Sequence, residues 1–292
     1  MPAEMLALGA AITFGANNFF MGIGLRHASP ATGATVSVVA QGIFLWSFYF
    51  YVGGYTAWTW LAVGIFALGG ICAPGLARWC SYTGFVRIGP ANSVSLVASS
   101  PLFAALLAII FLAEDVTIFI ALGTALVVAG AMIISRGGRK LQNWRKRDMI
   151  WPFAAAFLFA LRDVLVRYGL REYSLPMLAA AITVSTSFVL LMVTQGLSGE
   201  LLNFNPSRRN LPFFLSAAIC VTGSYIFMFT ALSQGNVVVV TPLVAAHPLV
   251  TIGLTVIFLR KTEIVTWQTI LGAIFIIAGA VVITSGDRLL AS

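Results

Sequence analysis

Two residues of opposite charge stand side by side within a long apolar run, Arg162 and Asp163. A charge near the middle of a membrane-spanning helix is costly, so such residues normally face a cavity or a partner. We expect Arg162 to hold a carboxylate or another anion, and Asp163 to hold an ammonium group or to carry a coupling proton. The alternative is an internal pair of Asp163 with Arg167, four residues later on the same helix face. That pair would leave Arg162 in need of an anion.

The first apolar run carries polar and aromatic residues at equivalent positions. Shifted by 145 positions, the charged pair aligns with Asn17 and Asn18, and Phe159 aligns with Phe14. We expect Phe14 and Phe159 to line a site and the two asparagines to donate hydrogen bonds to a ligand. Hydrogen bonding between helices is the alternative for the asparagines.

The third apolar run and its counterpart in the second half carry an aromatic patch. Arg78, Trp79 and Tyr82 lie in the first half, and Tyr225 and Phe229 lie in the second. Aromatic faces suit apolar groups and cations, which favours a role in binding. The alternative is contact with lipid, with Arg78 extending to the membrane surface.

The fourth apolar run contributes Asn92 and Ser99 to the candidate site, and Pro101 marks a helix break. Pro248 is the equivalent proline of the second half, and His247 precedes it. Histidine can change charge near neutral pH, which makes His247, with Asp163, a candidate for proton coupling. A neutral histidine that donates to a carbonyl freed by the proline is the alternative.

The composition predicts that lipid surrounds most of these residues. Of 292 residues, 60% are hydrophobic and only 9% are charged, whereas soluble domains carry roughly 25% charged residues. The net charge of +8 therefore fits anchoring to an anionic leaflet and not a nucleic-acid surface. Three separate cysteines in apolar runs predict neither a disulfide framework nor a zinc site. We expect no metal and no cofactor.

Apolar runs of about 20 residues predict membrane-spanning helices. The sequence contains ten of them, which predicts an all-α integral membrane protein. We place them at 4–25, 32–52, 57–86, 91–112, 117–135, 149–170, 176–196, 210–232, 237–259 and 266–284.

The chain contains an internal duplication. Residues 114–117 (EDVT) return as 263–266 (EIVT), 149 positions further on. Each copy holds five predicted helices, and an odd number forces the second copy to begin on the opposite side of the membrane. The chain is therefore predicted to form two inverted five-helix repeats. We assign residues 1–136 to the first repeat, 137–148 to a basic linker and 149–292 to the second repeat.

Basic residues in the loops predict the orientation. We call the side of the N-terminus the near side and the opposite side the far side. Twelve Lys and Arg residues fall on the far side, and three fall on the near side, Arg167, Arg171 and Arg288. Cytoplasmic loops carry the excess of positive charge, so we expect both termini to lie outside the cytoplasm, in a bacterial inner (plasma) membrane.

Several markers recur at equivalent positions of the two copies. They are a glutamate after the fourth helix of each copy (Glu114, Glu263), a proline within that helix (Pro101, Pro248) and paired glycines in the fifth (Gly123, Gly130 and Gly272, Gly279). This pattern resembles the EamA branch of the drug/metabolite transporter superfamily. The resemblance implies alternating access to a central cavity lined mainly by the first, third, fourth, sixth, eighth and ninth helices. It also implies that the fifth and tenth helices pack together at the rim. Many members export small metabolites such as amino acids, often with cytoplasmic termini.

We interpret Glu114 and Glu263 as caps on the fifth and tenth helices, because negative charge is favourable at a helix start. The glycines recur every seven residues, which predicts close packing of these helices within a monomer or at a homodimer contact.

The sequence therefore predicts a secondary transporter that exports a small polar or amphoteric metabolite, with amino acids as the first choice. Small organic anions carrying a carboxylate, sulfonate or phosphonate are the alternative. A membrane-embedded enzyme is the third choice, because no cluster with metal-ligand spacing or Ser-His couple occurs. The chain also lacks a Walker A sequence. The expected partners are a small-molecule substrate and the lipid bilayer, without nucleic acid.

Overall fold

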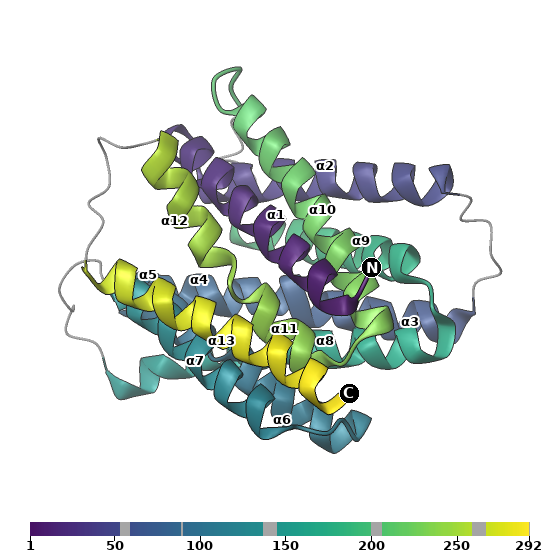
Figure 1. The fold of residues 1–292 in the computed structure, drawn as a ribbon. Helices are drawn as coiled ribbons and strands as arrows, with labels where there is room; N and C mark the ends of the chain where they lie inside the picture. Colours follow the sequence, from purple (N-terminus) through teal and green to yellow (C-terminus); the bar gives the residue numbers. More distant parts are fainter. Residues whose placement is uncertain (53–58, 89, 137–144, 200–205, 259–266, 292) are drawn as a thin grey trace.

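The structure is a computed structural model that describes residues 1–52, 59–88, 90–136, 145–199, 206–258 and 267–291 (Figure 1). All regular structure in these ranges is helical. The elements are α1 (Ala3–Gly24), η1 (Leu25–His27), α2 (Pro30–Tyr51), α3 (Trp60–Gly70), η2 (Ile71–Leu76), α4 (Ala77–Ile88), α5 (Pro90–Val97), α6 (Ser100–Leu112), α7 (Ile118–Arg136), η3 (Lys146–Met149), α8 (Ile150–Tyr173), α9 (Pro176–Ser198), α10 (Leu211–Gln234), α11 (Val237–Val244), α12 (His247–Phe258) and α13 (Trp267–Ala291).

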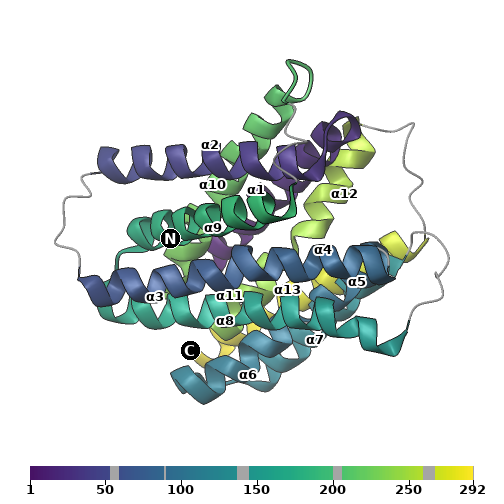
Figure 2. The same cartoon turned by 180° about the vertical axis from the view of Figure 1, so that it is seen from behind.

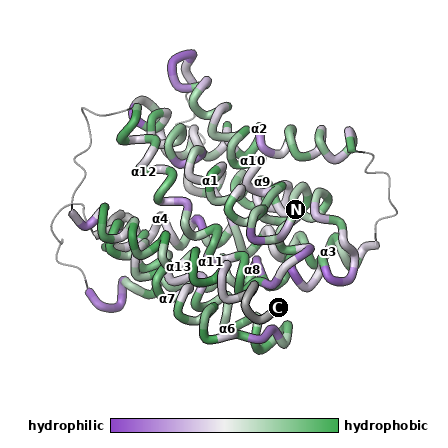
Figure 3. Tube along the Cα trace, in the orientation of Figure 1, coloured by the Kyte–Doolittle hydropathy of each residue, from purple (hydrophilic) through white to green (hydrophobic). Residues whose placement is uncertain are grey.

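The helices form ten membrane spans, as the sequence predicts. Nine described segments are long and apolar enough to cross a membrane, and the apolar part of α7 is a shorter tenth. Hydrophobic residues dominate the helices, whereas hydrophilic residues gather at loops and helix ends (Figure 3). The N- and C-termini lie at the same end of the bundle (Figure 1), which an even number of spans requires.

Three of the ten spans consist of two helical pieces. The fourth span is α5 followed by α6, and the ninth is α11 followed by α12; Pro101 and Pro248 are each the second residue of the new helix. The third span, which the sequence predicts as one helix, is interrupted in η2. There Ala73 is extended (φ −152°, ψ 138°), because a residue before a proline avoids the helical region.

The two halves pack as an inverted pair. The first helix of each half packs against the third and fourth spans of the other half: α1 against α10 and α12, and α8 against α3, α4 and α6. The view from behind shows α2 and α9, and then α3 and α8, running side by side (Figure 2). Exchanging the halves therefore exchanges one set of contacts for the other, as a twofold axis in the membrane plane requires.

The fifth and tenth spans, α7 and α13, contact each other through their glycines. A Cβ atom on Gly130 would lie 2.6 Å from the carbonyl oxygen of Gly272, and one on Gly279 would lie 2.6 Å from that of Gly123. Only glycine permits so close an approach of two backbones. The predicted glycine stripes thus meet within one chain.

Candidate functional site

A cavity of about 560 Å³ lies between the two halves. Its walls come from α1, α2, α4, α5, α8 and α10, from the break at Pro74 and from the α11–α12 junction. At the far side the lining includes Met21 near the end of α1, Leu25 of η1 and Ala34 near the start of α2. The cavity therefore extends from the middle of the spans into the far half.

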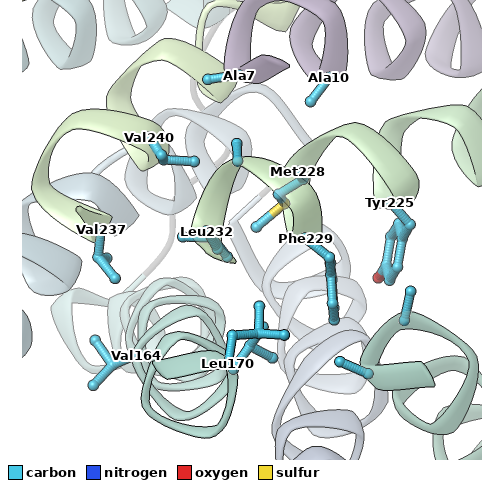
Figure 4. Close-up of a cluster of buried hydrophobic side chains, with 14 of the residues drawn as sticks. Ala7, Ala10, Val164, Leu170, Tyr225, Met228, Phe229, Leu232, Val237 and Val240 are labelled. Atoms are coloured by element: carbon cyan, nitrogen blue, oxygen red, sulfur yellow. The ribbon is translucent and has the colours of Figure 1, made fainter. Parts of the chain in front are cut away.

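Buried apolar side chains fill the near half instead. Ala7 of α1, Leu232 of α10 and Val237 of α11 are fully buried, and Figure 4 shows them in one cluster with Val164 and Leu170 of α8. This packing separates the cavity from the near side.

Arg162 and Asp163 lie on the cavity wall in the middle of α8 and bind each other. Nε of Arg162 donates to Oδ1 of Asp163 at 2.8 Å, and Nη2 lies 2.6 Å from the same oxygen. Nη1 points to the hydroxyl of Tyr225 at 3.5 Å, and the guanidinium lies 5.6 Å from the ring centre of Phe159. The donors of Arg162 are thus largely engaged. By contrast, Oδ2 of Asp163 has no hydrogen-bond partner within the described ranges.

The alternative pair of Asp163 with Arg167 does not form. Arg167 turns towards the near side, where Nη1 donates to the carbonyl oxygen of Leu232 at 2.6 Å. Its Nε lies 3.6 Å from Oε1 of Glu114, an ionic contact longer than a hydrogen bond. Sequence spacing alone places Asp163 and Arg167 on one face, but both find better partners on other residues.

Glu114 does not cap the fifth span, contrary to the sequence interpretation. Thr117 does so, because its Oγ1 accepts a hydrogen bond from the backbone N–H of Ile120 at 3.3 Å. The Glu114 side chain is fully buried and accepts from Nη2 of Arg171 at 3.1 Å. Its other oxygen accepts from the N–H of Val238 at 3.2 Å, in the first turn of α11. Glu263, the second predicted cap, lies outside the described residues.

The end of α6 explains why Glu114 points inward. Ala113 adopts a left-handed conformation (φ 50°), and the N–H of Glu114 then bonds to the carbonyl oxygen of Ala108 at 3.3 Å. This arrangement closes the helix and turns the chain sharply. Glu114 therefore joins the end of the fourth span to α8 and α11 of the other half.

A polar chain links α1 to α12 at the cavity. The side chains of Asn17 and Asn18 lie 3.2 Å apart, and Nδ2 of Asn18 lies 3.2 Å from Nδ1 of His247. Phe14 packs edge-on against His247, with ring centres 4.8 Å apart. All four residues line the cavity. An amide N–H donates, so with this contact Nδ1 of His247 is the acceptor and the ring is neutral.

Of the aromatic candidates, Tyr225 lines the cavity, whereas Phe229 and Trp79 do not. Tyr225 lines the cavity, and Phe229 stacks beneath it, fully buried. Trp79 is not among the lining residues: it is half exposed and packs against Trp151. Successive helical residues are about 100° apart, so α4 presents Arg78 to the cavity and Trp79 to the outside. The prediction that Trp79 lines the cavity is therefore wrong.

Of the two candidate residues on the fourth span, Ser99 and Asn92, the structure describes the side chain of Ser99 only. Ser99 donates to the carbonyl oxygen of Leu96 at 2.6 Å and is not among the lining residues, whereas its neighbour Ser100 is. The structure does not describe the side chain of Asn92 on this span, nor that of Tyr82 on the third span.

Gln41 of α2 lines the cavity and was not a sequence candidate. It is only 4% exposed, and its Nε2 has no hydrogen-bond acceptor. An unsatisfied buried donor costs about 1–3 kcal/mol, so this amide is poised for an acceptor. Its place within an apolar run was the available signal. Arg78 is half-buried on α4 and makes no hydrogen bond or ion pair with any residue that the structure describes.

Comparison with known proteins identifies the family. The model of the EamA-like transporter family matches residues 1–136 and 147–285. The chain belongs to this family. This EamA-like protein is thus a membrane transporter of the drug/metabolite transporter superfamily. A solved crystal structure shares its fold, with a TM-score of 0.80, 14% sequence identity and coverage of 99% of each chain. A search of curated proteins finds no match.

Proposed function

We propose that this EamA-like transporter moves a small amphoteric metabolite, an amino acid in the first instance, by alternating access. The observation that carries the proposal is the pair of opposite charges, Arg162 and Asp163, on the wall of a mainly apolar cavity between the repeats. A zwitterion offers complementary charges to such a site, and its apolar part suits Phe14, Phe159 and Tyr225.

We further propose that the far side is cytoplasmic. Far-side loops carry most Lys and Arg residues, which favours that orientation. Two of the three near-side arginines, Arg167 and Arg171, contact the buried carboxylate of Glu114, so they add little free positive charge there. With this orientation the cavity extends towards the cytoplasm, which suits a protein that loads its substrate there and exports it.

Small organic anions remain the second candidate substrates. Arg78 lines the cavity without a counter-charge among the described residues, so the lining carries two arginines and one aspartate. That excess of positive charge favours a carboxylate, sulfonate or phosphonate. Catalysis is not part of the proposal, because the family consists of transporters.

Uptake into proteoliposomes tests the proposal. The probe is a labelled amino-acid mixture, offered with and without an inward proton gradient. Saturable uptake above that of empty liposomes, with competition by unlabelled amino acids, is the expected result. Unsaturable uptake would point to a channel. No uptake of amino acids together with uptake of labelled organic anions would select the second candidate.

A further inference from the structure

Two residues of the first repeat line the cavity and carry donors without a partner among the described residues, Gln41 on α2 and Arg78 on α4. The Gln41 side chain is more than nine-tenths buried, and its Nε2 has no acceptor. Arg78 likewise has neither a hydrogen bond nor an ion pair within the described part of the chain. Unsatisfied donors on a cavity wall are rare in folded proteins, because buried polar groups are normally paired. Both can therefore donate to a ligand that binds in the cavity.

The two donors lie at a similar depth. Gln41 is close to the middle of α2, and Arg78 follows the break at Pro74 by four residues, which is about one helical turn. The charged pair lies on α8 of the second repeat, which packs against α4 and lines the same cavity. A ligand that contacts α2 or α4 together with α8 would touch both repeats.

The charged pair on α8 offers an acceptor and few free donors. Arg162 directs Nε and Nη2 to Oδ1 of Asp163 and Nη1 towards Tyr225. Oδ2 of Asp163 remains without a partner among the described residues. This wall therefore suits a cation better than an anion.

We propose that Gln41 and Arg78 form the carboxylate subsite of the cavity and that Oδ2 of Asp163 receives the ammonium group of the same substrate. Arg162 then acts as a positioning residue that holds the Asp163 carboxylate. This inference rests on the proposed transport of amino acids and deepens it. It assigns the carboxylate to the first repeat, in place of Arg162, and makes the substrate a bridge between the repeats.

Three matched probes test the assignment: leucine, 4-methylpentanoate, which lacks its amine, and 3-methylbutylamine, which lacks its carboxylate. Their binding to the purified full-length protein is measured by equilibrium dialysis of labelled compounds. The expected order of affinity for the wild type is leucine, then 4-methylpentanoate, then the amine.

The variants separate the two subsites. Arg78→Gln should lower the affinity for leucine and 4-methylpentanoate at least tenfold and leave the amine unchanged, with partial recovery in Arg78→Lys. Gln41→Leu should weaken the same two probes several-fold without lowering the thermal unfolding temperature, because it removes a donor that has no partner. Asp163→Asn should weaken leucine and the amine but not 4-methylpentanoate.

Arg87→Gln is the matched control, because Arg87 lies on the same helix but pairs with Asp148 outside the cavity. Wild-type affinity for the carboxylate probes in Arg78→Gln would overturn the subsite, as would equal loss of all three probes in a variant that is stably folded. A wild type that binds only 4-methylpentanoate, and loses it in Arg78→Gln, would keep the subsite and refute the amino-acid proposal. A wild type that binds none of the probes would refute both.

Discussion

The carboxylate of Glu114, at the end of the fourth span, accepts a hydrogen bond of 3.1 Å from Arg171, at the end of the sixth. Nη1 of Arg171 also donates to the carbonyl oxygen of Leu112 at 2.8 Å. Because Glu114 also binds the N–H of Val238, one buried side chain joins the first repeat to two helices of the second. These bonds lie at the near end, where apolar packing closes the cavity, so they stabilise the closed near side.

Glu114→Ala should therefore destabilise the protein strongly. The change leaves Arg167 and Arg171 without their carboxylate and the first turn of α11 without an acceptor, and loss of a buried ion-pair partner costs about 3–5 kcal/mol. Thermal unfolding of the purified protein measures the effect. Asp115→Ala is the matched control, because the neighbouring Asp115 is exposed. Equal unfolding temperatures for the two variants would refute the structural role of Glu114.

The packing of α7 on α13 gives a second stability prediction. In Gly130→Ala the new Cβ would lie 2.6 Å from the carbonyl oxygen of Gly272, so the two helices must move apart. Overpacking of this kind costs about 1–3 kcal/mol. Gly42→Ala in α2 is the control, because a Cβ there meets nothing within 4 Å and alanine favours a helix by up to about 1 kcal/mol. Similar unfolding temperatures for Gly130→Ala and Gly42→Ala would contradict the close contact.

The sequence predicts the spans and their duplication because both depend on local signals. Apolar length alone defines a membrane-spanning helix, and the return of residues 114–117 as 263–266 defines the repeat. Glu114 was misinterpreted for the opposite reason. Its partners Arg171 and Val238 lie 57 and 124 residues away, and only tertiary packing brings them together.

The charged residues of the candidate site could be predicted from the sequence, but their hydrogen-bond partners could not. Arg162 and Asp163 stand out in an apolar run, whereas the absence of a partner for Gln41 is a property of the packed cavity. The prediction that Trp79 lines the cavity was wrong for a different reason. In a membrane helix both the lipid-facing and the inward-facing surfaces are apolar, so the periodicity of apolar residues does not separate them. Arg78 marks the inner face of α4 only once the helix is seen against α8.

Proton coupling distinguishes the two candidate groups. Asp163 presents a free oxygen to the cavity, whereas Nδ1 of His247 is already bonded to Asn18. Asp163→Asn should therefore remove the effect of an inward proton gradient on amino-acid uptake, and His247→Gln should keep it. Counterflow at equal pH on both sides of the membrane, which needs no net proton movement, checks that each variant still carries substrate. Loss of the gradient effect in His247→Gln alone would assign the proton to His247.

The orientation of the chain in the membrane can be tested with single cysteines at opposite ends of the bundle. Pro2 is exposed at the near end, and Arg147 is exposed in η3 at the far end. In a background without the native cysteines, a membrane-impermeant thiol reagent added to intact cells should label Pro2→Cys and spare Arg147→Cys. Permeabilised cells, in which both should react, provide the control. The opposite pattern in intact cells would place the termini in the cytoplasm, and the cavity of this conformation would then release substrate outside the cell instead of loading it from the cytoplasm.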